Sequence, residues 1–144
     1  MSGWAALMVI AGGLFAGGAA TFAWSRVPIW RRTPAPGFVE DFAETIHRTD
    51  KVQPALLVLT IAASIAFAMT EDGTGRVLAL VGAGGFLVVL VASAAVLVPL
   101  QRRIIASRDQ QAVPEMRERW FRGNLGRSIL SVAAFVAVVV ASVA

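Results

Sequence analysis

Residues 77–100, VLALVGAGGFLVVLVASAAVLVPL, decide the fold class of this chain. The stretch contains no Asp, Glu, Lys, Arg or His. As a helix its 24 residues would extend about 36 Å, more than the roughly 30 Å of hydrocarbon in a bilayer. Lipid offers the backbone no hydrogen-bond partner, so a spanning segment of this length must be helical. Residues 77–100 are therefore predicted to form a transmembrane helix.

Three further apolar runs, residues 4–24, 54–70 and 127–144, are also long enough to cross a bilayer. The chain is 57% hydrophobic and only 15% charged, with a mean hydropathy of +0.71. These values are typical of an integral membrane protein and not of a soluble domain. The sequence thus predicts an all-α integral membrane protein. Its fold is an antiparallel bundle of four transmembrane helices, with residues 1–144 forming a single domain.

Prolines set the expected helix boundaries. We expect the chain to leave the first helix through Val27 and Pro28, and the third helix to end at Pro99. The fourth helix should begin at Pro114 and continue from residue 114 to 144, with its membrane part at 127–144. We recognise no internal repeat. The first run lacks a basic residue before it and is interpreted as a retained helix rather than a signal peptide.

Two other local patterns predict how the helices pack. Gly13 and Gly17 have the four-residue spacing that lets another helix approach closely. Residues 37–50 predict a short cytoplasmic amphipathic helix between the first two transmembrane helices. Its apolar face consists of Phe38, Val39, Phe42 and Ile46. Such a helix either lies on the membrane surface or covers the end of the bundle, and the pattern does not distinguish these two positions.

The basic residues predict the orientation. Of thirteen Lys and Arg residues, only Arg76 lies in the short connection between the second and third helices. The other twelve lie in or beside the two long connections, which by the positive-inside rule are cytoplasmic. The protein is therefore predicted in the plasma (inner) membrane, with both termini outside. The sequence pI near 11.3 then reflects topology, and no nucleic-acid partner is predicted.

Several function classes are disfavoured by what the sequence lacks. None of the four apolar interiors contains an ionisable residue, which argues against a proton-coupled transporter. One histidine and no helical pair of ligands argue against a haem or di-iron bundle, and no metal or other cofactor is predicted. The absence of cysteine excludes thiolate catalysis. The candidate functional groups therefore gather at the cytoplasmic end.

A polar stripe opens the fourth helix. Trp120, Asn124, Arg127 and Ser131 are spaced at i, i+4, i+7 and i+11, so they share one helix face. A planar guanidinium beside an amide can stabilise an anionic or enolate oxygen in a partly dry site. In the alternative interpretation, Arg127 extends to a lipid phosphate and Trp120 is an interfacial anchor.

Ion pairs are predicted beside this stripe. Glu115 precedes Arg119 by four residues and Glu118 precedes Arg122 by four, the favourable order on a helix. No carboxylate stands four residues from Arg127, which is therefore predicted to be free for another partner.

His47 is the candidate general base, because it is the only side chain whose unperturbed pKa lies near neutrality. It could serve only if its imidazole points into the mouth of the bundle. The alternative is a solvated histidine on the polar face of a surface helix.

Four short motifs resemble the anthrone-oxygenase-like family of small four-helix membrane proteins, most of them uncharacterised. They are Val27-Pro-Ile-Trp-Arg-Arg32, Gln53-Pro54, Val98-Pro-Leu-Gln-Arg-Arg103 and Arg119-Trp120-x-x-x-Asn124-x-x-Arg127. The resemblance implies a four-helix bundle with a pocket at the motif-bearing end. For characterised members it implies an O₂-dependent oxidation of an anthrone to an anthraquinone, without an obvious metal or flavin motif. This chain has Gln101 where the family pattern has Asn.

Taken together, the residues and the resemblance predict a membrane-embedded oxygenase-like enzyme that oxidises a hydrophobic phenolic or polycyclic small molecule with O₂. The predicted catalytic residues are His47, Arg127 and Asn124, and the predicted substrate-binding residues are Trp120, Arg119, Gln101 and Trp30. The alternative is a non-enzymatic membrane accessory subunit or a lipid- or quinone-binding module. The expected partners are membrane lipid and a hydrophobic small molecule, with a homo-oligomer or a partner membrane subunit as further alternatives.

Overall fold

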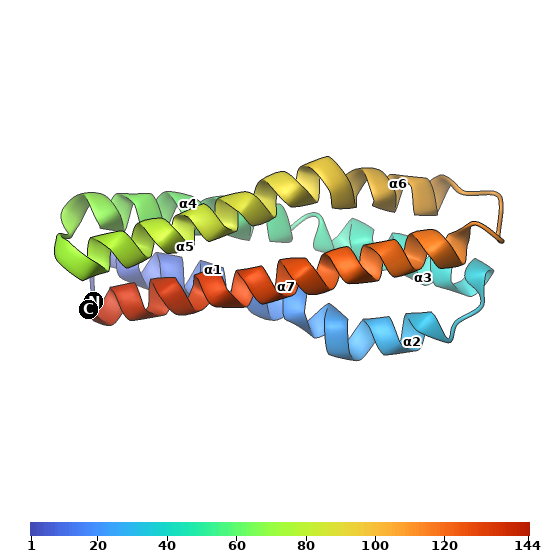
Figure 1. Cartoon of the computed structure of the whole chain (residues 1–144), viewed down its shortest axis with the longest axis horizontal. Helices are drawn as coiled ribbons and strands as arrows, with labels where there is room; N and C mark the ends of the chain where they lie inside the picture. Colours follow the sequence, from blue (N-terminus) through green and yellow to red (C-terminus); the bar gives the residue numbers. More distant parts are fainter.

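The computed structural model describes all residues, Met1–Ala144, and contains helices and short turns but no strand. Four helical segments, Gly3–Arg31, Ala35–Thr70, Gly73–Ala106 and Val113–Val143, are long and apolar enough to span a membrane. Successive segments run in opposite directions, and both termini lie at one end of the molecule (Figure 1). The prediction of an all-α chain with four helices able to cross a membrane is confirmed.

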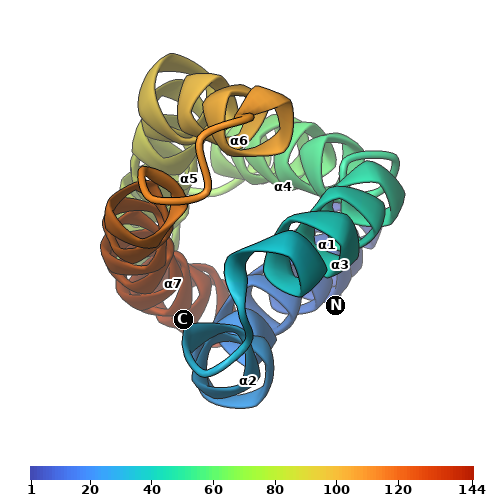
Figure 2. The same ribbon diagram turned by 90° about the vertical axis from the view of Figure 1, so that its right-hand side faces the viewer.

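The segments divide into nine elements, two of which are π-helical. In chain order they are α1 (Gly3–Thr21), η1 (Phe22–Arg26), α2 (Val27–Arg31), α3 (Ala35–Thr49), α4 (Gln53–Thr70), α5 (Gly73–Ala92), η2 (Ser93–Leu97), α6 (Val98–Ala106) and α7 (Val113–Val143). Helices α1 and α5 each pack against both α4 and α7. The view along the bundle accordingly places α1 diagonally opposite α5 (Figure 2).

The predicted ends of the first and third helices were wrong, because Pro28 and Pro99 lie inside continuous helical segments. A proline cannot donate to the carbonyl four residues earlier, and its ring collides with that carbonyl in a regular helix. Here the preceding turn is widened instead. The N–H of Val27 donates to the carbonyl of Phe22, and the N–H of Val98 donates to that of Ser93, both five residues earlier. Each π segment thus lets the helix continue past its proline.

Pro54 has a different effect, because the chain breaks just before it. Residues 50–52 form a turn between α3 and α4, and Pro54 lies in the first turn of α4, where no N–H is needed. The predicted boundaries of the second and fourth helices agree with the structure to within a residue at their starts. Helix α3 begins at Ala35, two residues earlier than expected, with Pro36 in its first turn.

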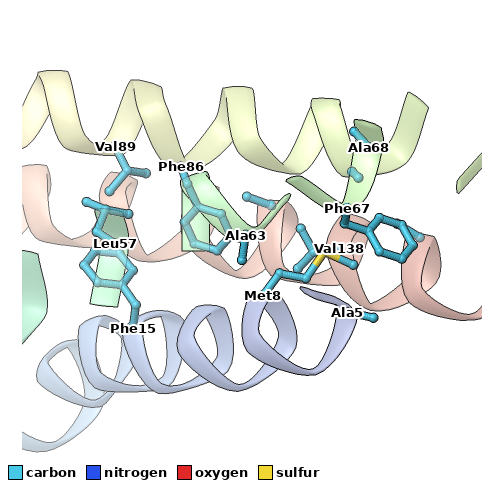
Figure 3. Packing of buried hydrophobic residues seen from close by; sticks show 13 residues of the cluster. Ala5, Met8, Phe15, Leu57, Ala63, Phe67, Ala68, Phe86, Val89 and Val138 are labelled. Atoms are coloured by element: carbon cyan, nitrogen blue, oxygen red, sulfur yellow. The ribbon is translucent and has the colours of Figure 1, made fainter. Parts of the chain in front are cut away.

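Two hydrophobic cores are stacked along the bundle. The first lies between α1, α4, α5 and α7 and includes Phe15 and Phe86, whose rings meet edge to face at 6.1 Å (Figure 3). The second, which we call the aromatic core, lies at the end opposite the termini. It consists of Phe22, Val27, Trp30, Phe38, Phe42, Ile46, Leu97, Ile104, Val113, Trp120 and Phe121. We call this end of the bundle the basic end, because twelve of the thirteen basic residues lie there.

The amphipathic helix α3 supplies part of the aromatic core. Phe38 and Phe42 are fully buried and Ile46 is nearly so, while Val39 is only partly buried. The apolar face of α3 is therefore covered by the other helices, and the alternative in which it rests on lipid does not describe this structure. Burying one apolar side chain in this way stabilises the folded protein by about 1.5–3 kcal/mol.

Polar contacts fasten the short helix α2 to its neighbours. Arg31 Nε lies 2.8 Å from Glu118 Oε1, and Arg117 Nη1 donates to the backbone carbonyls of Trp30 and Thr33. The predicted helical ion pairs Glu115 with Arg119 and Glu118 with Arg122 were wrong, since neither pair forms a salt bridge. Glu118 instead binds Arg31 from another helix. Exposed helical pairs contribute only a few tenths of a kcal/mol, so tertiary contacts readily replace them.

The chain contains an internal repeat, contrary to the expectation from sequence. Val98-Pro99 follows Val27-Pro28 by 71 positions, and η2 follows η1 by the same interval. Buried positions keep this register as well: Phe15 corresponds to Phe86, and the other pairs are Met8 with Ala79, Ala11 with Gly82, Leu57 with Ser128, Thr60 with Ser131, Ala63 with Ala134 and Phe67 with Val138. The two halves are thus similar helical hairpins.

The prediction that Gly13 and Gly17 both allow close helix contact was partly wrong. A methyl group on Gly13 would meet the ring of Phe135 at 3.2 Å, but one on Gly17 would meet nothing within 4 Å. A closer contact than that at Gly13 is found at Gly82 on α5. A Cβ there would lie 2.5 Å from Val138 Cγ1 and 3.1 Å from the carbonyl of Ala134, on α7.

Gly82→Ala is therefore expected to lower the free energy of unfolding by about 1–3 kcal/mol through overpacking. Gly84→Ala, two residues away on the same helix, meets nothing within 4 Å. It is expected to leave stability unchanged or to raise it by up to about 1 kcal/mol. Reversible unfolding in detergent measures both variants. Equal stability of the two would show that α5 and α7 do not pack as described.

Candidate functional site

A polar layer separates the two cores, and it contains a partly open cavity of about 180 Å³ between α4 and η2. Three of the apolar residues that line it are Phe15, Leu57 and Leu90. The polar and charged residues that line it are Asp50, Gln53, Ser93, Gln101 and Arg127. The cavity is thus an apolar hollow with a small set of polar groups, the usual composition of a small-molecule site.

Two prolines create this cavity. Pro54 interrupts the chain between α3 and α4, and Pro99 is the reason for the widened turn η2. Both irregularities lie in the cavity wall, since Pro54, Ser93 and Ala94 line it. Single π turns inside α-helices occur frequently at functional sites, because the displaced residues leave the regular packing.

The predicted polar stripe of α7 does face the interior. Trp120, Asn124 and Ser131 are buried, and Arg127 is half-buried and lines the cavity. Arg127 Nη2 donates to Asn124 Oδ1 at 2.7 Å, and Ser131 Oγ donates to the carbonyl of Arg127 at 2.6 Å. Asn124, Arg127 and Ser131 are therefore connected by hydrogen bonds on the inner face of the helix. Arg127 bonds to an amide of its own helix and takes part in no ion pair.

Three buried polar atoms of this layer have no hydrogen-bond partner within the protein: Ser93 Oγ, Asn124 Nδ2 and Arg127 Nε. Leaving such a group unpaired costs about 1–3 kcal/mol, and more for a charged group. Native proteins keep few of them, and mostly for a functional reason. Ser93 and Arg127 both line the cavity, so two of these unpartnered donors belong to residues of its wall.

Gln101 connects the stripe to the cavity. Its side chain is 5% exposed, lines the cavity and accepts a hydrogen bond from Trp120 Nε1 at 3.3 Å. Trp120 itself is fully buried in the aromatic core. Arg127, Asn124, Gln101 and Trp120 are thus brought together as one group, although Gln101 is on a different helix from the other three.

Asp50 is the site residue that the sequence analysis missed. It lies in the turn between α3 and α4, outside the apolar spans, and lines the cavity together with Arg127. Asp50 is an exposed residue, but partial burial of its carboxyl raises the pKa above its ordinary value, while the charges of Arg127 and His47 oppose that rise. The available signal was an acidic residue three positions before Gln53 of the Gln53-Pro54 motif. Nothing in the sequence placed that turn beside α7.

Of the predicted site residues, Arg127 and Gln101 line the cavity, and Asn124 and Trp120 are hydrogen-bonded to them. The other three lie apart from the cavity. His47 is exposed on α3 and is not part of the cavity wall, so its catalytic role stays a prediction. Trp30 is fully buried in the aromatic core, where its Nε1 donates to Asp41 Oδ2 at 2.6 Å. Arg119 is exposed and shares with Arg103 a separate groove between α6 and α7.

The charged residues offer no evident metal centre, since no group of three or more His, Asp or Glu side chains lies close enough to hold an ion. The chemistry open to the cavity residues is proton transfer at Asp50 and stabilisation of an oxyanion by Arg127 and Ser93, with Asn124 hydrogen-bonded to Arg127.

Comparison with known proteins gave one result. The family model described as Anthrone oxygenase matches residues 42–137, two thirds of the chain, and this range contains every polar residue of the cavity wall. No curated protein and no solved structure gave a significant match.

Proposed function

The chain belongs to the anthrone oxygenase family, and from this membership we propose that it oxidises a hydrophobic phenolic or polycyclic small molecule with O₂ in the cavity beside Arg127. The observation that carries the proposal is that Ser93 and Arg127, each with an unpartnered donor, line one cavity together with Asp50. The lining is otherwise mostly apolar, as a hydrophobic substrate requires.

The proposed reaction begins with proton removal. A ring methylene flanked by aromatic rings and conjugated to a carbonyl is acidic, because its enolate gains an aromatic ring. Asp50 takes this proton, and its raised pKa makes it a better base than an ordinary carboxylate. Arg127 and Asn124 hold the enolate oxygen with donors that are already in place.

The enolate then reacts with O₂. A carbon–oxygen bond forms at the deprotonated carbon and gives a peroxide anion, which takes up one proton from water to become a hydroperoxide. The hydroperoxide then loses water to leave a ketone. The methylene is oxidised by four electrons and O₂ is reduced by four, so one oxygen atom enters the product and the other leaves as water. The step needs no further oxidant or reductant.

His47 has a supporting role in this proposal. It is exposed on α3 three residues before Asp50, and its charge acts on the pKa of that carboxyl. We therefore place the imidazole on the route by which the proton passes from Asp50 to water, while the base that contacts the substrate is Asp50.

The size of the cavity restricts the substrate pose. A dry engineered cavity of about 150 Å³ holds one benzene ring. The present cavity of about 180 Å³ accommodates the reacting ring, and the rest of a polycyclic substrate extends through the opening between α4 and η2.

Oxygen uptake by the purified protein in nanodiscs tests the proposal, with anthrone as substrate and anthraquinone as the measured product. We expect O₂ consumption and anthraquinone formation in a 1:1 ratio, well above the spontaneous rate. A rate equal to that of empty nanodiscs, with anthrone and with a panel of phenols, would count against an oxygenase.

One observation favours the second candidate, a lipid-binding module without enzymatic activity. Arg103 and Arg119 line a groove of about 390 Å³ with Val96 and Pro99, and neither arginine takes part in an ion pair. An anionic headgroup over an apolar floor suits this groove. Native mass spectrometry that finds only phospholipid, together with absent O₂ uptake, would favour this candidate.

We also propose that the basic end faces the cytoplasm of the inner membrane, since twelve of thirteen basic residues lie there. The chain has no cysteine, so single cysteines report topology without background. In whole cells a membrane-impermeant maleimide should label Glu71→Cys and not Gln110→Cys. The reverse labelling would invert the orientation.

A further inference from the structure

The internal repeat gives the cavity a counterpart in the other half of the molecule. The cavity lies between α4 and η2, and the equivalent place lies between α7 and η1. Ala94, Pro54 and Leu57 line the cavity, and the residues 71 positions from them, Ala23, Leu125 and Ser128, all line a shallow crevice at that equivalent place. The two hollows are therefore equivalent in the fold.

Three polar residues of the cavity wall have aromatic equivalents in the other half, and these belong to the aromatic core. Ser93, Gln101 and Asp50 of the cavity correspond in register to Phe22, Trp30 and Phe121. Phe22 stacks on Trp30 with ring centres 6.0 Å apart and planes 27° apart. Trp30 stacks on Phe121 at 6.3 Å and 9°. One half thus has three polar side chains where the other half has three stacked rings.

We infer that a planar aromatic ligand takes, between α4 and η2, the place that the stacked rings of Phe22, Trp30 and Phe121 take in the other half. Ser93 is then a specificity-determining residue, because its small side chain keeps that place open. This inference rests on the proposed function and adds to it the place in which a flat ring of the substrate lies and the residue that keeps this place open. An aliphatic chain or a sterol lacks such a flat aromatic ring.

The position of Ser93 explains why it has this effect. Ser93 is the first residue of η2 and Phe22 is the first residue of η1, so the two side chains leave equivalent widened turns in equivalent directions. The hydroxyl of Ser93 has no partner in the protein, so packing with its neighbours does not account for a serine here. A phenylalanine at this position has a precedent in the same fold and should be tolerated.

The test compares the binding of anthrone to wild type, Ser93→Phe and Val91→Phe in nanodiscs by equilibrium dialysis. Val91 is 59% exposed and lies two residues before Ser93, so Val91→Phe adds the same ring on the outer surface. We expect Ser93→Phe to weaken anthrone binding at least tenfold and Val91→Phe to change it less than threefold. Gln101→Trp is the second filling variant, for use if Ser93→Phe does not fold.

The outcomes separate this inference from the proposed function. Equal anthrone affinity of wild type and a folded filling variant, or no anthrone binding by wild type, overturns the inference, whatever the O₂-uptake result. Loss of binding in the filling variants supports it even if the wild type consumes no oxygen, in which case only the proposed reaction fails. Stronger binding of a straight-chain alcohol than of anthrone would also overturn the inference.

Discussion

Replacing Arg127 with methionine should lower kcat for substrate oxidation by about 10²–10³-fold, the usual cost of removing one donor to a developing oxyanion. Arg127 lines the cavity with its Nε free, and its one side-chain hydrogen bond to another side chain goes to Asn124. Methionine has a similar length and no charge, so the cavity keeps its shape while the donors are lost. Steady-state oxygen uptake and anthraquinone formation measure the effect.

The control is Arg122→Met on the same helix, where the arginine is exposed and takes part in no ion pair. That variant should keep at least half of the wild-type rate. Arg127→Met should remain folded, because an arginine with an unsatisfied buried nitrogen contributes little net stability. If folded Arg127→Met oxidises substrate within threefold of the wild-type rate, Arg127 has no part in the chemistry.

Asp50→Asn is expected to reduce kcat/KM by about 10²–10⁴-fold, the typical contribution of a positioned general base. The amide keeps the size of the side chain but cannot accept the substrate proton. His47→Gln should reduce the rate less than tenfold, because a proton released at the exposed edge of α3 can also pass directly to water.

The pH profile gives a second readout of Asp50. The base must be ionised to act, so the wild-type kcat/KM should fall as the pH drops through the pKa of Asp50. Because burial raises that pKa, the acid limb should lie above the ordinary value of about 3.9. Asp50→Asn should lose this limb. Full activity of Asp50→Asn, together with inactivity of His47→Gln, would instead return the role of base to the histidine.

Local patterns in the sequence determined much of the architecture. The four apolar runs specify helices that can span a membrane, because chain length and hydrophobicity decide this without reference to any other segment. The 3.6-residue period correctly placed Phe38, Phe42 and Ile46 on the buried face of α3. It also placed Trp120, Asn124 and Ser131 on the inner face of α7. Both assignments depend only on the spacing of residues within a single helix.

Only the tertiary structure decided what the prolines do. Pro54 breaks the chain, whereas Pro28 and Pro99 are absorbed by widened turns. The choice between breaking and widening depends on packing against neighbouring helices, which no local pattern contains. The same dependence on distant partners explains the failed ion pairs, since Glu118 prefers Arg31 of α2 to Arg122 of its own helix.

The sequence predicted only part of the candidate site, for a related reason. Arg127 and Asn124 were identified because they lie on one helix face, where spacing alone brings them together. Asp50 and Ser93 come from other parts of the chain and join Arg127 only where the break before α4 faces the widened turn η2. Sequence thus determined the four helices and the polar face of α7. The cavity, and the carboxylate beside it, came from how those helices pack.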